Sequence, residues 1–184
     1  MRIKYNAPVV LTFTFISIAV MALSHFTNGI YTRAFFVVGG QMNFSDPLDY
    51  FRMISNIFGH ANWAHLIGNF SLILLIGPLL EEKYGSWSLG QMIFATAIFT
   101  SILNIALLDT GAYGASGIVF MMILLGSLSN FKDGEIPLTF LLIAVLYVGE
   151  EVVNSLKPDN VSQFAHILGG FCGACFGFFL KSEK

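Results

Sequence analysis

Charged residues divide this chain into six apolar stretches, and that division restricts how the chain can fold. Of its 184 residues, 55% are hydrophobic and only 11% are charged, whereas soluble domains carry about 25% charged residues. A helix rises about 1.5 Å per residue, so about 20 apolar residues cross a bilayer core. The sequence therefore predicts an all-α, polytopic membrane protein with six transmembrane helices. The stretches are 5–26, 63–80, 84–108, 111–131, 136–149 and 160–180.

The fifth stretch is short, with 14 residues between Glu135 and Glu150. We expect it to cross with little tilt and to continue past Glu150 and Glu151, with both carboxylates facing water or protein. The direction of the last stretch depends on this crossing. Without it, the last stretch would run the other way.

Lysine and arginine residues predict the orientation of the chain. The first stretch is longer than the core of a signal peptide, which has about 7–15 residues, so we expect it to be retained. Six crossings place both termini on one side, and the side richer in basic residues faces the cytoplasm. The counts of six and three predict cytoplasmic termini. The six are Arg2, Lys4, Lys83, Lys132, Lys181 and Lys184; the three are Arg33, Arg52 and Lys157.

Three polar residues lie at one depth in this arrangement. His65, Ser116 and His166 each lie 15 or 16 residues before the charged residue that closes their stretch. That spacing corresponds to about 22–24 Å along a helix, which places all three near the outer face. Polar side chains in hydrocarbon are costly and mark functional sites by default. The sequence therefore predicts a shallow intramembrane catalytic centre.

Ser116 is a candidate nucleophile. Three glycines within residues 110–117 disfavour a helix there, so we expect a loop that dips inward and a helix that runs from about Ser116 to Asn130, about 22 Å. The unpaired amides and positive dipole of its first turn would favour a developing negative charge at Ser116. Alternatively, Gly114 and Gly117 with their small neighbours only let two helices approach closely.

His166 is the candidate base. Gly169, Gly173 and Gly177 follow it at spacings of four and line one helix face, which permits close packing on a neighbour. His166 lies roughly on that face, so it would reach Ser116 if the neighbour is the fourth stretch. A neutral imidazole can then take the serine proton.

No carboxylate lies at the same depth, so a dyad is expected rather than a triad. Phe120, one turn after Ser116, is placed to stack on the imidazole. His65 and Asn69 share one helix face and, with the Ser116 amide, can surround an oxyanion. The alternative for Asn69 is a hydrogen bond between helices.

The remaining polar residues predict neither a metal nor a cofactor. His60 and His65 are five residues apart, do not share a helix face and have no acidic partner in the stretch. Cys172 and Cys175 have redox-motif spacing, but their small apolar neighbours fit a buried helix better. The net charge of −2 and the absence of a basic block give no reason to expect a nucleic-acid partner.

The loop 27–62 is too long for a linker and too apolar to float in water, so we expect an amphipathic hairpin on the membrane surface. Within it, Arg52 either joins backbone carbonyls or anchors lipid headgroups.

Several motifs occur in an order and spacing that resemble the rhomboid family of intramembrane serine proteases. The resemblance spans all six stretches and is closest to the minimal six-helix bacterial form, a single membrane domain over 1–184. The motifs are Arg52, His60-Ala-Asn-Trp-Ala-His65-Leu-Ile-Gly-Asn69, Glu81 with Tyr84-Gly85-Ser86, Gly114-Ala-Ser116-Gly117 and Ala165-His166-Ile-Leu-Gly169.

The resemblance implies a nucleophile at Ser116, a base at His166 and oxyanion donors at His65 and Asn69. It also implies that Arg52 and His60 organise the outer loop and that Glu81 braces the cytoplasmic end of the second helix. The implied reaction is cleavage of transmembrane segments of other proteins, in the inner membrane of a bacterium, with the active site toward the outer face. The fifth helix would move aside to admit the substrate.

Two positions depart from the family pattern. Phe51 replaces a usual tryptophan, and Phe120 replaces a frequent tyrosine, so a ring remains in each case while a hydrogen-bonding group is lost. The alternative function is therefore a weak or inactive relative that binds transmembrane clients. A small transporter fits less well, because the polar residues gather near one face and no opposing set completes a path.

Overall fold

The structure, a computed structural model, describes residues 3–128, 136–143, 145–146 and 163–180. These residues are mostly helical and form no strand beyond one bridge between Val38 and Ala112. The expectation of an all-α fold is confirmed for this part of the chain. The helices are α1 (Pro8–Phe26), α2 (Ile30–Phe35), α3 (Pro47–Ser55), the short 3-10 helix η1 (Asn56–Phe58), α4 (Trp63–Tyr84), α5 (Ser86–Leu107), α6 (Ser116–Ser127) and α8 (Gln163–Phe179).

Among the described residues, three helices are long and apolar enough to cross a membrane. They are α1, α4 and α5, with 19, 22 and 22 residues and mean hydropathies of 2.0, 1.7 and 1.6. The apolar helices α6 and α8 are shorter, and α6, with 12 residues, spans only about 18 Å. In the fifth predicted stretch, residues 138–143 and 145–146 are helical, while 144 and 147–149 lie outside the described residues.

The ends of α4 follow from its flanking residues. Asn62 begins the helix, because its side-chain oxygen accepts the backbone N–H of His65 at 2.8 Å. The helix ends at Gly85, whose φ of 78° is left-handed and suits glycine. We expected the apolar stretch to end at residue 80, but the helix continues through the charged residues to Tyr84. Charged side chains end an apolar stretch without ending a helix.

Glu81 joins the far ends of three helices. Its carboxylate is buried and accepts the backbone N–H groups of Val9 and Val10 at 2.9 and 3.0 Å, and the hydroxyl of Ser86 at 2.7 Å. The two amides belong to the first turn of α1, which has no side-chain cap of its own. Glu81 therefore caps α1 from α4, where a negative charge also complements the helix dipole.

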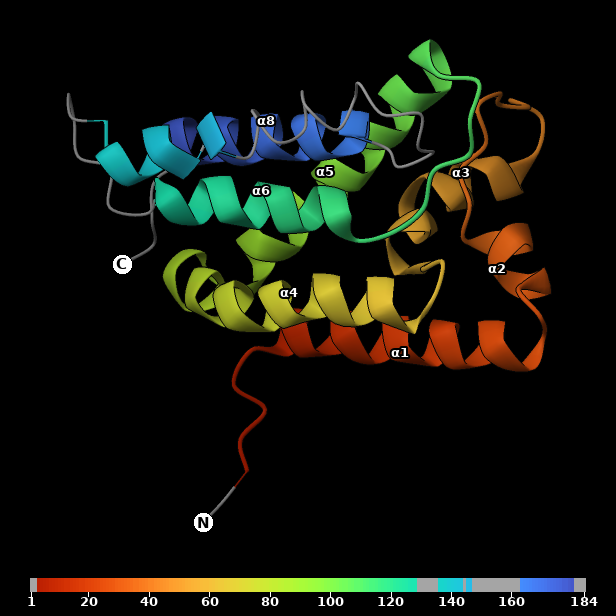
Figure 1. Ribbon diagram of the computed structural model, residues 1–184, viewed down its shortest axis with the longest axis horizontal. Coiled ribbons are helices and arrows are strands. Elements are labelled where there is room, and N and C mark those ends of the chain that lie inside the picture. The colour runs from red at the N-terminus through yellow and green to blue at the C-terminus, as the bar shows by residue number, and fades with distance from the viewer. Residues whose placement is uncertain (1–2, 129–135, 144, 147–162, 181–184) are drawn as a thin grey trace.

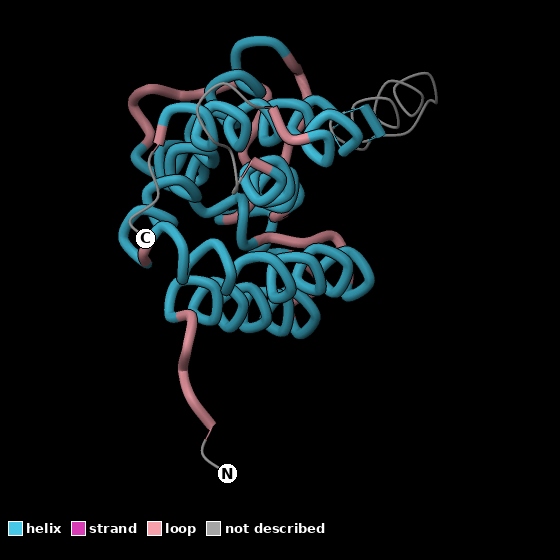
Figure 2. Tube along the Cα trace, turned by 90° about the vertical axis from the view of Figure 1, so that its left-hand side faces the viewer, coloured by secondary structure: helices cyan, strands magenta, loops and turns pink. Residues whose placement is uncertain are grey.

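The helices α6 and α8 run parallel along a seam of glycines. A side chain at Gly169 would overlap the backbone of Gly117, and one at Gly173 would overlap the backbone of Met121. The contacts advance in the same direction on both helices, so α6 and α8 begin at the same end of the bundle. Figure 1 shows them side by side above the pair α1 and α4, and Figure 2 shows the same two tiers with several helices close to end-on.

The segment between α1 and α4 contains two short helices, where we expected a hairpin. The helices α2 and α3 contact each other and lie at the end of the bundle where α4 and α6 begin (Figure 1). Arg52 of α3 joins them, since its Nε donates to the carbonyl of Ala34 at 2.9 Å. It also pairs with Asp49 at 2.6 Å. The backbone N–H of Asn43 and the guanidinium of Arg52 hold the pKa of Asp49 below its ordinary value.

Candidate active site

Ser116 is the first residue of α6. The turn directly before it contains a residue with an unusual backbone conformation. Gly114, two residues earlier, has a φ of 125°, which a side chain rarely adopts. The N-cap residue of α6 is Ala115, whose side chain has no acceptor for the first amides of the helix. These amides point toward the region around Ser116, where the helix dipole favours negative charge.

The outer segment holds this turn by backbone contacts. Val38 and Ala112 exchange two hydrogen bonds of 3.0 and 2.9 Å. The carbonyl of Asn56 accepts the N–H of Gly114 at 2.9 Å, and Nε2 of His60 accepts the N–H of Ala115 at 3.4 Å. The approach to Ser116 is thus fixed from the segment between α1 and α4.

His166 lies on α8, the helix that packs along α6. Its imidazole stacks on the ring of Phe120, with centroids 4.5 Å apart and an interplanar angle of 9°. A side chain placed at Gly117 would lie 3.2 Å from the carbonyl oxygen of Ala165. The α8 backbone beside His166 therefore packs on the residue next to Ser116, and the glycine face of α8 lies against the fourth stretch.

The α4 helix adds His65 to the same region. A side chain at Gly114 would lie only 2.9 Å from Cε1 of His65. Because glycine has no side chain, the imidazole of His65 can pack directly against the turn. His65 is also near enough to His166 for the two imidazoles to interact electrostatically. Residues from α4, α6 and α8 thus meet at one end of the bundle.

Asn69 lies one turn further along α4 from His65. Its side chain is buried, and its Nδ2 has no hydrogen-bond partner among the described residues. A buried amide without a partner costs free energy, and this donor is available to an oxygen that enters the site. We considered a hydrogen bond between helices for Asn69, and Nδ2 makes none among these residues.

The position of His60 differs from our expectation. We treated His60 and His65 as separated by their spacing on a helix, but α4 begins only at Trp63 and the two rings meet edge to face at 5.1 Å. Burial, with the charge of His65, lowers the pKa of His60 to about 4, so its imidazole is neutral at pH 7. Nδ1 lies 3.2 Å from the carbonyl of Phe58 and must donate, because Nε2 accepts from Ala115.

The other two predicted site residues lie elsewhere. Arg52 acts within the α2 and α3 pair, and Glu81 lies at the opposite end of α4, 16 residues from His65 and so about 24 Å away. Within the described part of the chain, no three His, Cys, Asp or Glu side chains gather in a way that could hold a metal ion.

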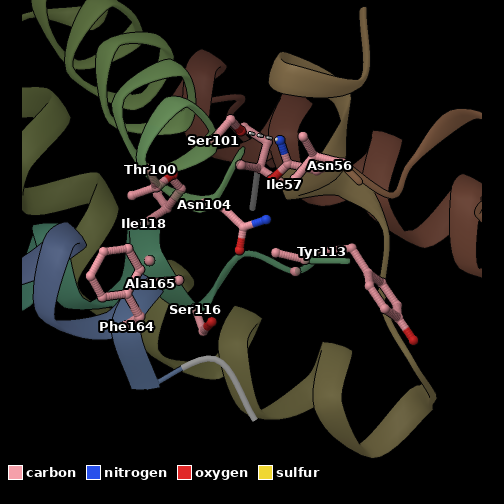
Figure 3. A pocket seen from close by; sticks show the side chains of 14 residues that line it. Asn56, Ile57, Thr100, Ser101, Asn104, Tyr113, Ser116, Ile118, Phe164 and Ala165 are labelled. Atoms are coloured by element: carbon pink, nitrogen blue, oxygen red, sulfur yellow. Dashed lines mark hydrogen bonds between the residues drawn. The ribbon is translucent and has the colours of Figure 1, made fainter. Parts of the chain in front are cut away.

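A cavity of about 40 Å³, lined by both polar and apolar residues, adjoins Ser116. An ordered water needs about 10–15 Å³, so the cavity has room for roughly three waters. Figure 3 shows Ser116 at its edge, with Phe164 and Ala165 of α8 beside it. Four amide and small hydroxyl side chains that also line the cavity were not predicted from the sequence, although they stand within or before apolar stretches. These are Asn56, Thr100, Ser101 and Asn104.

The helices and their hydropathy define an integral membrane protein. The family model described as Rhomboid domain matches residues 47–183, well over half of the chain. The protein therefore belongs to the rhomboid family, and the resemblance read from the sequence is confirmed.

Relatives with curated names agree with this assignment. Rhomboid-related protein 1 of Caenorhabditis elegans is 30% identical over 69% of this chain and 39% of that protein. Rhomboid-type serine protease 2 of Emericella nidulans is 29% identical over 68% of this chain and 25% of that protein. Rhomboid-like protease 1 of Toxoplasma gondii is 25% identical over 72% and 47%. The chain spans less than half the length of these three relatives.

Proposed function

We propose that this protein is an intramembrane serine endopeptidase that cleaves transmembrane segments of membrane proteins with a dyad of Ser116 and His166. One observation carries the proposal. The two residues lie on parallel helices in backbone contact, and the imidazole is stacked on Phe120 one turn after the serine. One relative named as a serine protease and another named as a protease support the same reaction.

In the proposed first step, the Ser116 oxygen attacks the carbonyl carbon of the scissile peptide bond while His166 takes the hydroxyl proton. The carbonyl oxygen becomes negatively charged. Nδ2 of Asn69, the imidazole of His65 and the amide of Ser116 are the donors proposed to stabilise it. His166 then gives its proton to the leaving nitrogen, and the C–N bond breaks.

In the second step, water attacks the carbonyl carbon of the resulting Ser116 ester while His166 takes a proton from that water. The C–O bond to Ser116 then breaks, His166 returns the proton to the serine oxygen, and the new carboxyl end leaves. The cavity beside Ser116 supports this step, because it is large enough for water and part of its lining is polar. No metal or cofactor is needed.

We also propose the six crossings and the orientation expected from the sequence, within a single domain over 1–184. Because α6 and α8 run in the same direction, the chain between them has to return along the bundle, which supports a fifth crossing. Both termini would be cytoplasmic, and the site would face outward in a bacterial inner membrane. Arg52 and His60 would organise the outer segment, and Glu81 would brace the cytoplasmic end.

The test is covalent labelling of Ser116 by a fluorophosphonate in purified protein, with cleavage of a single-span reporter measured in parallel. We expect Ser116→Ala to abolish labelling, and Ser116→Ala and His166→Ala each to lower cleavage by about 10³-fold or more. Ser127→Ala, at the other end of α6, is the matched control and should label normally.

A folded protein that resists labelling would instead support the alternative, a weak or inactive relative that binds transmembrane clients. One observation favours this alternative, because Phe120 provides a ring without a hydroxyl to orient the base.

A further inference from the structure

Asn56 lies between the outer segment and the turn that leads to Ser116. It follows α3, begins η1 and is only 6% exposed. Its carbonyl accepts the N–H of Gly114 at 2.9 Å. Gly114 is the residue with the left-handed backbone, so this hydrogen bond acts on the most constrained point of the turn.

The side chain of Asn56 fixes the position of that carbonyl. Its Nδ2 donates to the carbonyls of Arg52 and Met53, at 2.9 and 2.8 Å, and lies 2.9 Å from Oγ of Ser101 on α5. Ser101 itself donates to the carbonyl of Met53 at 2.9 Å. Figure 3 shows the contact between Asn56 and Ser101 as a dashed line. One buried amide thus joins the end of α3 to the wall of α5.

The turn has little freedom once these contacts are made. Gly114 is held by Asn56, Ala115 is held by His60, and the next residue is Ser116. The oxyanion amide and the nucleophilic oxygen both belong to that next residue. A shift of the turn would therefore move both catalytic atoms together, and misplacement by about 1 Å can cost about 10²-fold in rate.

We propose that Asn56, through its side-chain bonds to Ser101 and to the end of α3, is a positioning residue that sets the place of Ser116 by holding Gly114. The inference rests on the proposed function, because it assumes that Ser116 reacts. Asn56 makes no contact with the substrate in this proposal and acts through the backbone alone.

The experiment measures the second-order rate constant for fluorophosphonate labelling of Ser116, together with kcat and KM for the reporter, well below the thermal midpoint. We expect Asn56→Ala to lower the labelling rate constant and kcat by about tenfold or more, with KM within about twofold of wild type. Ser101→Ala should lower both less, because Asn56 keeps its two carbonyl partners.

A double substitution separates positioning from simple loss of stability. If the two residues act as one unit, Ser101→Ala should have little further effect in the Asn56→Ala background. Thr14→Val on α1 is the matched control, since it also removes one buried hydroxyl bonded to a carbonyl, that of Val10 at 2.8 Å. It should change the thermal midpoint at most and leave the labelling rate constant unchanged.

The outcomes distinguish the two proposals. Wild-type protein that is not labelled refutes the protease itself. Labelled wild type with an unchanged rate constant in Asn56→Ala, or with additive effects of the two substitutions, refutes the positioning role alone. If Asn56→Ala does not fold, Ser101→Ala decides, and a wild-type rate constant in that variant overturns the proposal.

Discussion

At the scale of single residues, His60 shows how burial sets chemistry. The ring is 1% exposed and accepts the N–H of Ala115 through Nε2. That acceptor exists only while the imidazole is neutral, because a protonated ring has two donors and no lone pair. The titratable groups that face it from the packed elements are the imidazoles of His65 and, beyond it, His166.

This predicts a loss of stability in acid. The pKa of His60 is about 4 in the folded protein against an ordinary value of 6.5. Between these values the unfolded chain binds a proton that the folded chain does not, so the free energy of unfolding falls as the pH falls, by about 3 kcal/mol in total. The measurement is the thermal midpoint in detergent from pH 7.5 to 4.

His60→Gln keeps an acceptor for Ala115 but does not titrate, so we expect a shallower loss of stability in that variant. His25→Gln, at an exposed position on α1, is the control and should follow wild type. An equally steep loss in His60→Gln would rule out His60 as the titrating group.

Individual polar residues were predictable where hydrocarbon makes them costly. His65, Ser116 and His166 stood out because they interrupt apolar stretches, and the structure places them in one region. Asn56 was missed, because its importance depends on a backbone contact with Gly114, which is 58 positions away and leaves no local pattern. The spacing argument for His60 was wrong because it assumed a helix before the capping residue.

At the scale of elements, the glycine seam joins the two helices that carry the proposed dyad. The spacing of four predicted a tight face on the last helix, since residues four apart share a face. It could not name the partner, because any close neighbour satisfies such a face. The match between Gly169 and Gly117 appears only in three dimensions.

Two glycines on α8 allow a paired test. A side chain at Gly173 would overlap the backbone of Met121, whereas one at Gly170 would lie 3.7 Å from the side chain of Leu124, an ordinary contact. We expect Gly173→Ala to destabilise the protein by about 1–3 kcal/mol and to reduce cleavage. Gly170→Ala should preserve both, since alanine favours helix. Unfolding by denaturant in detergent checks this, and equal stability of the two variants would disprove the seam.

At the scale of the whole molecule, orientation follows from charge and not from packing. Nothing in the contacts between helices distinguishes one side of a membrane from the other, so the distribution of lysine and arginine remains the argument for cytoplasmic termini. The long apolar helices were predictable from composition, while the end of α6 and the two short helices before α4 depend on tertiary contacts.

Cysteine labelling in intact cells tests the orientation. In a background with Cys172 and Cys175 replaced by alanine, we expect Ser45→Cys in the outer segment to react with an impermeant maleimide. Lys4→Cys should react only after the membrane is permeabilised. Both positions are exposed. The reverse pattern would invert the topology, and reaction of both in intact cells would place them on one side.

The contact of α6 with α8 also bears on how a bulky helical substrate could enter. The backbones of α6 and α8 are in direct contact, so the two helices cannot separate without losing the surface that they share. They would therefore move together. In the proposed protease, a substrate would then enter by displacement of other elements, while Ser116 and His166 move together.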